Sequence, residues 1–482
     1  MPFSPPDGLV VVVKRDCPTC EMVVPVLREL AVQPVPLTVY VQDDPTFPEG
    51  LTAVSDTTLE ASYHLNIEIV PTLLRVAGGQ ETVRVEGWNK ENWRALTAVA
   101  DLGETLPDHR PGCGSKSVEP GMPEKLAVRF GDAQIASRRV EVPPLLDEIE
   151  FCYEQGWSDG LPVVPPTEER VYRMLQGTTR DPQAVLGLVP PNKVPLTVEK
   201  VAINAVLAGC KPEYMPVVLT AVSAALRDEF CMHGILATTY FSSPVVIVNG
   251  PVARQIGMNS GVNVLGQGNR ANATIGRALQ LVIRNVGGGR PGEIDRAVLG
   301  TPGKYTFCFA ENEADSPWEP LAVSRGVAPG QSAVTLFAGD GVHAVVDQLS
   351  RTPESLARSF AATLKTVAHE KLALASEVLL VVSPEHGRTF RQAGWSRQRL
   401  LDDLHQLLLR PGSELVRGAN GIAEGLPEQF AGETAVPKFP PNGMHIVHAG
   451  GPAGMFSAVI GGWVATGSKG TQTVTEVLAL DK

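Results

Sequence analysis

Two cysteines separated by two residues point most directly to chemistry in this sequence. Cys17-Pro18-Thr19-Cys20 follows an apolar run, Gly8 to Val13, and precedes a helix-like segment, Glu21 to Leu30. Where a strand turns into a helix in this way, the first sulfur lies at the helix N-terminus, and partial positive charge there favours a thiolate. The spacing therefore predicts a redox-active dithiol that exchanges electrons with other thiols.

The other cysteines are candidate nucleophiles. Cys113 lies between two glycines and is followed by Lys116, which predicts an exposed thiol of low pKa that exchanges with Cys17. The alternative is an incidental thiol. In the long C-terminal region, we expect the substrate to be attacked by one of three cysteines: Cys210, Cys231 or Cys308. Each of these three is equally compatible with an ordinary core cysteine.

A glycine- and asparagine-rich loop, residues 257–272, directly precedes a helix-like segment. Its backbone N–H groups, amides and arginine suit an anion or a carbonyl oxygen, so we predict a polar substrate pocket there. Gly-Lys-Ser and Gly-Lys-Thr are absent from this loop, so it is not a Walker A motif. The alternative is a structural loop whose amides cap turns. The predicted pocket residues are Asn259, Ser260, Asn263, Arg270 and Asn272.

Residues 303–313 have the pattern of a strand that runs into paired carboxylates. Alternation along a strand places Lys304 and Cys308 on one face, so Lys304 is expected to favour a thiolate at Cys308 and to bind substrate. Glu311, past the strand end, is expected to transfer protons. Cys231 and His233 would share one side of another strand, which suits a nucleophile pair or two metal ligands, with a buried structural histidine as the alternative.

Small residues follow the strand-like run from Met444 to His448. Gly450 and Gly451 can form an oxyanion-type loop for a substrate, or simply a structural turn. His445 and His448 fall on opposite faces of a regular strand, which argues against a metal shared between them.

The pattern of residues 8–101 predicts, in order, a strand, a helix, a strand, a helix, two strands and a helix. This order of elements resembles that of the thioredoxin and glutaredoxin family. Two motifs resemble that family as well, Cys17-Pro18-Thr19-Cys20 and Ile69-Val70-Pro71-Thr72. The resemblance implies a redox domain in which Pro71 is a cis-proline packed beside the dithiol. The sequence departs from the family because no Trp precedes Cys17 and the first strand and helix of full thioredoxin are missing.

The chain of 482 residues is too long for one hydrophobic core, and we expect an α/β fold in several parts. Residues 1–101 are predicted to form the thioredoxin-like domain. Residues 102–145 are rich in proline and charge, and we expect a linker that carries Cys113. Residues 146–482 are predicted to form a large mixed α/β domain that binds the substrate and catalyses its reaction.

A second resemblance covers most of residues 146–482. Three segments are similar to segments of bacterial proteins grouped with UGSC-type selenoprotein relatives. They are Gly156-Trp157-Ser158-Asp159-Gly160-Leu161-Pro162, Ala208-Gly209-Cys210-Lys211-Pro212-Glu213-Tyr214 and Arg270-Ala271-Asn272-Ala273-Thr274-Ile275-Gly276-Arg277. That grouping implies thiol or selenol chemistry related to reductive bond cleavage. The chain departs from it at Lys116, which replaces the expected second cysteine.

Composition narrows the partners and the compartment. A net charge of −11 argues against nucleic acid and anionic membrane as partners, since both require clustered cations. We find no signal-peptide pattern at the N-terminus and no run of about 20 apolar residues. The seven scattered cysteines do not form a secreted disulfide framework, so we expect a cytoplasmic protein. The low charged fraction, 19%, suggests surface buried between domains or between subunits of a homo-oligomer.

These observations predict a thiol-dependent oxidoreductase or reductive lyase. The Cys17/Cys20 dithiol would regenerate a cysteine-based site acting on a small polar substrate, and an upstream thiol reductant or reductase would restore the dithiol. No organic cofactor is expected, although a bound metal is compatible with the sequence. One alternative is a lyase that handles a metal or organometal through Cys and His ligands. Another is a non-catalytic binding protein regulated by redox state.

Overall fold

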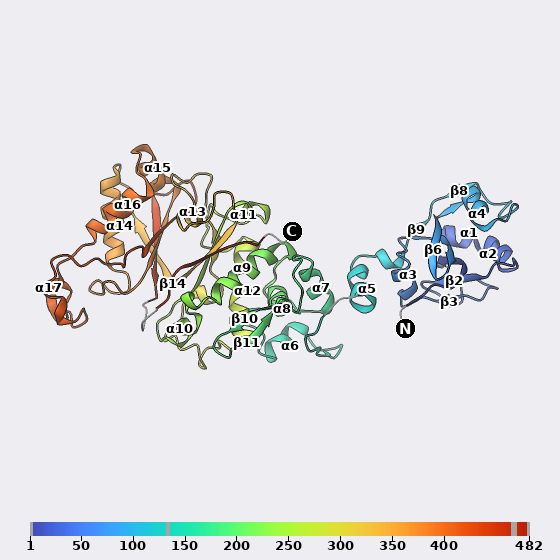
Figure 1. Ribbon diagram of the computed structural model, residues 1–482, viewed down its shortest axis with the longest axis horizontal. Coiled ribbons are helices and arrows are strands. Elements are labelled where there is room, and N and C mark those ends of the chain that lie inside the picture. The colour runs from blue at the N-terminus through green and yellow to red at the C-terminus, as the bar shows by residue number, and fades with distance from the viewer. Residues whose placement is uncertain (1–2, 132–134, 464–469, 480–482) are drawn as a thin grey trace. The chain divides into compact units, whose positions relative to one another are not determined.

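The chain divides into two compact units, residues 1–134 and 135–482. The computed structural model describes residues 3–131, 135–463 and 470–479 (Figure 1). Both units combine helices with sheets, so the predicted α/β class is confirmed. Within the described ranges, no helix is long and apolar enough to cross a membrane.

A five-stranded sheet of order β3-β2-β1-β5-β6 forms the centre of the first unit. β1 (Gly8–Val13) pairs in parallel with β2 (Leu37–Val41) and antiparallel with β5 (Thr72–Ala77). β6 (Gln80–Glu86) extends one edge, and the short β3 (Val54–Ser55) extends the other. β1 is central and buried, which explains why its sequence is apolar without alternation.

Four helices accompany this sheet in the order that the sequence predicts. They are α1 (Pro18–Met22), α2 (Val24–Ala31), α3 (Glu60–His64) and α4 (Lys90–Thr97). The single helix expected after the dithiol is divided at Val23 into α1 and α2. Pro25 accounts for the break, because proline lacks an N–H and clashes with the carbonyl of the preceding turn.

The segment expected to be a linker belongs largely to the first unit. Two short strands in it pair with strands of the preceding region, β8 with β7 and β9 with β4. Its last helix contacts α3, where the rings of Tyr63 and Phe130 lie 6.2 Å apart. The boundary between the units therefore falls at residue 134 and not at 101. The elements are β4 (Ile69–Val70), β7 (Trp88–Asn89), β8 (His109–Arg110), β9 (Cys113–Gly114), η1 (Lys116–Val118) and α5 (Met122–Phe130).

The second unit is built on a seven-stranded sheet of order β13-β12-β14-β17-β15-β16, with β18 also paired to β14. The long β14 joins two halves, because residues 333–339 pair with β12 and residues 342–346 pair with β17. The strands are β12 (Ser243–Asn249), β13 (Cys308–Ala310), β14 (Ala333–Val346), β15 (Val378–Val382), β16 (Met444–His448), β17 (Phe456–Gly462) and β18 (Val474–Val477).

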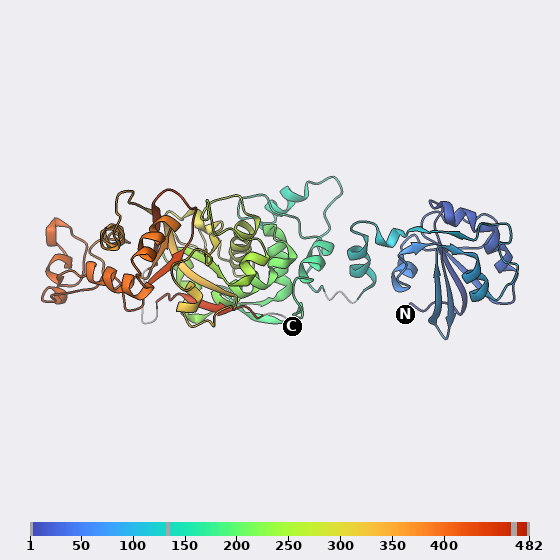
Figure 2. The same cartoon turned by 90° about the horizontal axis from the view of Figure 1, so that it is seen from above.

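Two groups of helices lie on opposite sides of these strands (Figure 1, Figure 2). One group is α8 (Val198–Ala208), α9 (Met215–Ala225) and α12 (Arg270–Asn285), and the other is α14 (Pro353–Lys365), α15 (Pro384–Gln392) and α16 (Arg397–Leu407). The smaller elements are α6 (Glu148–Glu154), α7 (Glu168–Leu175), β10 (Val185–Val189), β11 (Val194–Thr197), α10 (Met232–Ala237), α11 (Pro251–Gln255), η4 (Pro302–Lys304), α13 (Leu321–Ser324) and α17 (Gly412–Leu415).

The sheet of the second unit curls around a core of its own. Ile247 of β12 and Val381 of β15 belong to one inner cluster, although their strands lie in different halves. Their neighbour Val248 faces the helices of the first group instead, as alternation along a strand requires. At the open edges, the Asn312 N–H donates to the His448 carbonyl at 2.8 Å. The ends of β13 and β16 are thereby brought together.

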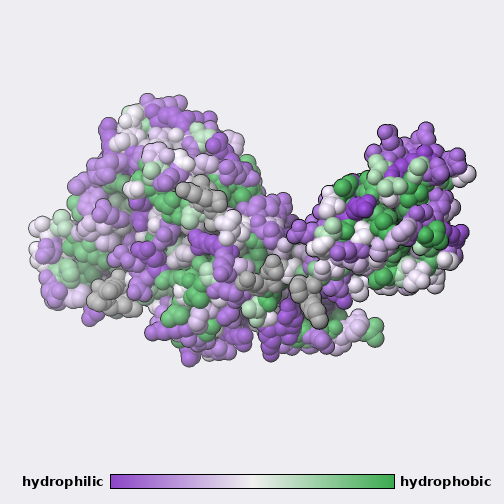
Figure 3. Space-filling view, turned by 45° about the vertical axis from the view of Figure 1, so that its right-hand side comes forward, coloured by the Kyte–Doolittle hydropathy of each residue, from purple (hydrophilic) through white to green (hydrophobic). Residues whose placement is uncertain are grey.

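The surface is mixed. On the face drawn in Figure 3, hydrophilic side chains are interspersed with smaller hydrophobic areas. Exposed large apolar side chains include Leu145, Leu299 and Leu349, which lie far apart in the sequence. Scattered apolar residues of this kind are normal for a protein surface.

Candidate functional site

The dithiol lies at the start of α1, where its residues cap the helix. Cys17 is the N-cap residue and has extended backbone angles, φ −153° and ψ 110°. Its sulfur accepts the N–H of Cys20 at 3.3 Å and lies 3.5 Å from the Val70 carbonyl oxygen. Pro18 occupies the first helical turn, where a missing N–H costs nothing. Both thiols are free and buried, with exposed fractions of 1% and 0%.

The two thiols differ strongly in acidity. The pKa of Cys17 is lowered to about 5, chiefly by a hydrogen bond from the Cys20 thiol. Burial raises the pKa of Cys17, and a hydrogen bond from Cys113 lowers it further. Burial and the hydrogen bond to Cys17 raise the pKa of Cys20. At neutral pH, Cys17 is thus the thiolate and Cys20 is the thiol. This division suits a nucleophile and a second thiol that resolves the mixed disulfide.

Cys113 lies directly beside this pair. β9 pairs antiparallel with β4, so that Cys113 is opposite Val70, the residue before Pro71. The Val70-Pro71 peptide bond is cis. On the other side of the segment, the Thr19 hydroxyl donates to the Pro111 carbonyl at 2.7 Å. Cys113 is therefore held against the dithiol by contacts on both flanks.

Gly112 is required for this close approach. A Cβ atom added there would lie 2.4 Å from Ile69 Cγ2 and 2.7 Å from the Val70 oxygen. A Cβ added at Gly114 would meet nothing within 4 Å. Sequence reasoning identified the two glycines only as a source of exposure. Gly112 and Thr19 were missed because their role depends on pairing between distant segments.

A polar cluster holds the residues that follow Cys113. The Gln42 amide donates to the Ser115 hydroxyl at 2.6 Å and accepts the Lys116 N–H at 3.1 Å. The Ser115 N–H donates to the Glu68 carbonyl at 2.8 Å. Ser115 is buried, unlike a residue in a solvated linker. These contacts fix the position of β9 within the first unit.

The acidity predicted for Cys113 is wrong in direction. Burial, the hydrogen bond with Cys17 and the charge of Cys17 raise the pKa of Cys113, and Lys14 opposes them weakly. Lys116 was expected to lower that pKa, but its ammonium group lies 4.0 Å from Glu119 instead. The reactive thiolate of the group is consequently Cys17, and Cys113 is its protonated neighbour.

Two cysteines of the second unit lie in the core. Burial raises the pKa of Cys210 to about 12, and burial also raises the pKa of Cys308. The Cys210 thiol donates to the Thr274 carbonyl at 3.3 Å. Cys308 packs against Gly276 of α12. Both therefore have the environment of structural cysteines, as does Cys152 in α6.

Of two predicted strands, one is shortened and the other is not formed. Residues 302–304 form the 3₁₀ helix η4, because Pro302 starts a helical turn, and β13 covers only Cys308–Ala310. Lys304 consequently does not share a strand face with Cys308, and its ammonium group binds both oxygens of Asp295 at 2.8 Å. Cys231 has φ 53° and precedes α10, which contains the exposed His233. The expected common side of a strand does not exist for this pair.

The amides of the loop 257–272 bind within the loop. Asn259 and Asn272 exchange two hydrogen bonds, from the Asn259 N–H to Asn272 Oδ1 at 3.0 Å and from Asn272 Nδ2 to the Asn259 carbonyl at 2.9 Å. Asn263 Nδ2 donates to the Gln267 carbonyl at 2.8 Å. Arg270 Nε donates to the Gly209 carbonyl at 2.9 Å. These contacts match the alternative interpretation, in which the amides cap turns.

Glu311 is buried where the ends of β13 and β16 meet. Its carboxylate accepts Asn249 Nδ2 and the Leu321 N–H at 2.7 Å and the His448 N–H at 3.3 Å, and Arg397 lies 4.0 Å away. Burial raises the pKa of Glu311, and Arg397 opposes that shift. Its partners are backbone and side-chain donors of the fold. Glu311 thus joins the two edges of the curled sheet.

The structure does bring together two of the predicted segments. The Gly450 N–H donates to the Ser260 carbonyl at 3.0 Å, and Gly451 packs against Val262. Since the Gly450 N–H is already bonded, it does not point toward a substrate oxygen. The contact fastens the loop after β16 to the loop before α12.

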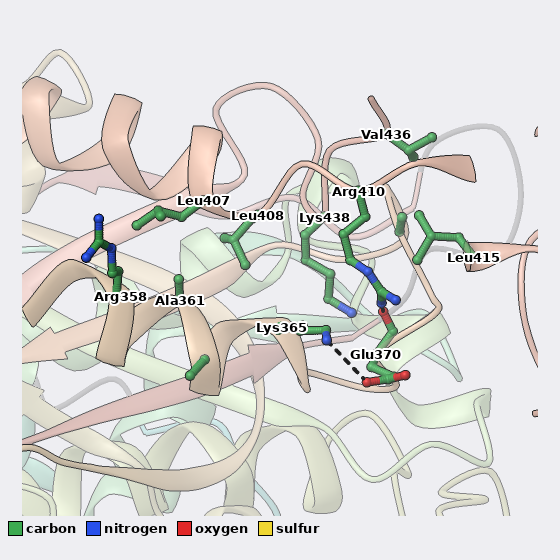
Figure 4. Close-up of a pocket in the computed structure, with 12 residues that line it drawn as sticks. Arg358, Ala361, Lys365, Glu370, Leu407, Leu408, Arg410, Leu415, Val436 and Lys438 are labelled. Carbon is green, nitrogen blue, oxygen red and sulfur yellow. Dashed lines mark hydrogen bonds and ion pairs between the residues drawn. The ribbon is translucent and has the colours of Figure 1, made fainter. Parts of the chain in front are cut away.

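A small cavity of about 210 Å³ lies between α14, α16 and the segment around Lys438 (Figure 4). Three of the four cations that line it are engaged by the protein itself, and the fourth, Arg358, is exposed. Lys438 donates to three backbone carbonyls, Lys365 lies 3.6 Å from Glu370, and Arg410 binds Glu414 at 2.9 Å. We assign these charges to the structure of this region.

No group of three or more His, Cys, Asp or Glu side chains suited to a metal ion occurs in the described ranges. Comparison with protein-family models, curated proteins and solved structures found no match.

Proposed function

We propose that the protein is a thiol-dependent oxidoreductase or reductive lyase whose electrons pass through Cys17 and Cys20. The observation that carries this proposal is the position of the Cys17 sulfur, which accepts the Cys20 N–H at 3.3 Å and lies 3.5 Å from the carbonyl oxygen of Val70, the residue paired with Cys113. The lowered pKa of Cys17 supplies a nucleophile at neutral pH. The resemblance of this region to thioredoxins and glutaredoxins is consistent with that role.

The geometry supports a balanced exchange in three steps. In the first, the Cys113 sulfur attacks the substrate disulfide; the Cys113–substrate bond forms, and one substrate thiol leaves with the proton that Cys113 gives up. In the second, the Cys17 thiolate attacks the Cys113 sulfur of this mixed disulfide; the Cys17–Cys113 bond forms and the rest of the substrate leaves as a thiolate. In the third, the Cys20 sulfur attacks Cys17, and Cys113 leaves with the proton that Cys20 gives up. Two electrons have then moved from the dithiol to the substrate disulfide.

The cycle requires a partner that reduces the Cys17–Cys20 disulfide. An upstream thiol reductant or reductase would supply these electrons by the same exchange chemistry. The second unit is proposed to bind the small polar substrate. Because both units belong to one chain, an encounter between them is intramolecular, and the effective concentration of linked modules reaches the order of millimolar.

Turnover of a small disulfide substrate tests the proposal. The full chain should reduce the disulfide of a short cystine peptide with dithiothreitol as the electron source, followed by chromatography of the reduced peptide. Cys17→Ser should lose this activity entirely, and Cys152→Ser should retain it because Cys152 is a core thiol remote in sequence from the dithiol. An unchanged rate in Cys17→Ser contradicts the proposed function.

A further inference from the structure

A second cavity in the large unit has the properties of a ligand site. Its volume is about 490 Å³, and α10, the start of β12, α12 and residues 289–305 line it. Small-molecule sites in proteins commonly have volumes of about 300–1,000 Å³. Lys304, which the sequence singled out as a substrate-binding residue, lies in this lining.

Two buried hydroxyls in the lining have no partner. Ser242 and Ser243 are exposed by 0% and 1%, and within the described residues neither Oγ has a hydrogen bond. Gly303 lies next to the Ser243 hydroxyl, and its lack of a side chain leaves space beside that group. A Cβ atom at position 303 would lie 2.8 Å from Ser243 Oγ. Buried polar groups nearly always have partners, so two unpaired neighbours indicate a polar group that binds there.

The cavity also holds a cation without a counter-ion. The guanidinium group of Arg284 in α12 takes part in no hydrogen bond or salt bridge among the residues that the structure describes, and its Nε is buried. Burial and the charge of Arg290 lower the pKa of Arg284, while Asp159 and Glu293 oppose this. An arginine in this state is suited to an incoming anion.

The other charges of the lining form closed pairs. Asp159 receives two hydrogen bonds from Arg277, at 2.8 and 2.7 Å. Asp295 receives two from Lys304, both at 2.8 Å. Arg284 is left as the unpaired charge of the lining. Lys365, Arg410 and Lys438 around the cavity of Figure 4 are different, because their partners are protein atoms.

We propose that this cavity binds a small hydroxylated organic anion. Its carboxylate or phosphate would pair with the guanidinium of Arg284, and its hydroxyl or carbonyl oxygen would bond to Ser242 and Ser243. This inference goes beyond the proposed function, because it names the class of ligand that the large unit binds. No cysteine lines the cavity within the described residues, so binding here is separable from thiol exchange.

Calorimetric titration of the full chain tests the inference. The probes are D-glycerate, glycerol 3-phosphate and glycerol, which offer a carboxylate, a phosphate and no charge on similar backbones. Saturable binding of at least one anion and none of glycerol is expected, and the preferred anion identifies the charged group. If neither anion binds, or if glycerol binds as well as they do, the inference is overturned.

Variants show whether the named residues do the binding. Arg284→Gln should weaken the preferred anion at least tenfold, and Ser242→Ala with Ser243→Ala should weaken it without abolishing folding. Arg358→Gln, an exposed arginine from the other cavity, is the matched control and should bind as the wild type does. Equal binding by Arg284→Gln, or by the double serine variant if Arg284→Gln fails to fold, overturns the inference. Cys17→Ser should bind normally, so failure of the dithiol function is recognised separately.

Discussion

Among Cys17, Cys20 and Cys113, the surroundings of each sulfur favour the thiolate at Cys17 and the protonated thiol at the other two. Cys17 receives the Cys20 N–H at 3.3 Å and a thiol hydrogen bond from each neighbour, all of which favour its charged form. Cys20 is buried without comparable support, so burial favours its neutral form. The asymmetry comes from position, because the two residues are chemically identical.

This asymmetry makes a pH prediction. The pKa of Cys17 is lowered, so its thiolate forms as the pH rises through about 5 and is lost below that value. The pKa of Cys17, measured by ultraviolet absorbance of its thiolate, should be higher in a Cys113→Ala variant than in the wild type. It should be higher still in Cys20→Ala, because the hydrogen bond from Cys20 lowers the pKa of Cys17 more than the one from Cys113 does. Titration of Cys17 at the ordinary pH of a free thiol in the wild type would contradict the account.

Among the elements, β9 has the largest consequence for the site. It adds two residues to β4 and places Cys113 opposite Val70. Gly112→Val should displace this strand, since its Cβ would collide with Ile69 and with the Val70 carbonyl. The pKa of Cys17 should then rise toward the value that Cys17 has in the Cys113→Ala variant, and alkylation of Cys113 should become faster.

Gly114→Ala is the matched control for this substitution. The added methyl group meets nothing within 4 Å, so the Cys17 titration should stay as in the wild type. Mass spectrometry after timed alkylation measures both variants. If Gly112→Val leaves Cys113 as protected as Gly114→Ala does, the pairing of β9 with β4 does not hold the thiol.

Local patterns predicted those elements that depend on nearby residues. The run Gly8 to Val13 is a strand, as expected, and the two strands predicted before the last helix of residues 8–101 are present as the antiparallel pair β5 and β6. Patterns failed where a distant partner or a proline decides. Pro302 turns the expected strand into η4, and the proline-rich stretch after residue 101 folds because β4 and β7 offer it free edges.

The candidate site was predictable to the same extent. The dithiol has a local signature, so its position was found from Cys17-Pro18-Thr19-Cys20 alone. An association of Cys113 with Cys17 was also predicted, but the pairing of β9 with β4 that brings these residues together, 96 positions apart, has no local signature. The same holds for Ser242 and Arg284, which meet in one cavity but share no sequence motif.

For the whole molecule, the division after residue 134 has a testable consequence. All the contacts of Cys17 described above lie within residues 1–131, so this fragment should fold alone and keep the lowered pKa of Cys17. Circular dichroism and the thiolate titration measure this. A shorter fragment, residues 1–101, lacks β8 and β9 and should show a higher Cys17 pKa. Loss of folding in the longer fragment would contradict the division.

Trapping of the exchange intermediate tests the central claim most directly. In a full-length Cys20→Ser variant, Cys17 cannot form its usual intramolecular disulfide, so mild oxidation should capture it in a disulfide with Cys113. Tryptic mass spectrometry should find the Cys17–Cys113 linked peptide as the main product, and Cys20→Ser with Cys113→Ser should lack it. If Cys17 pairs instead with Cys210, Cys231 or Cys308, or with no cysteine of the chain, the proposed exchange between Cys17 and Cys113 is contradicted.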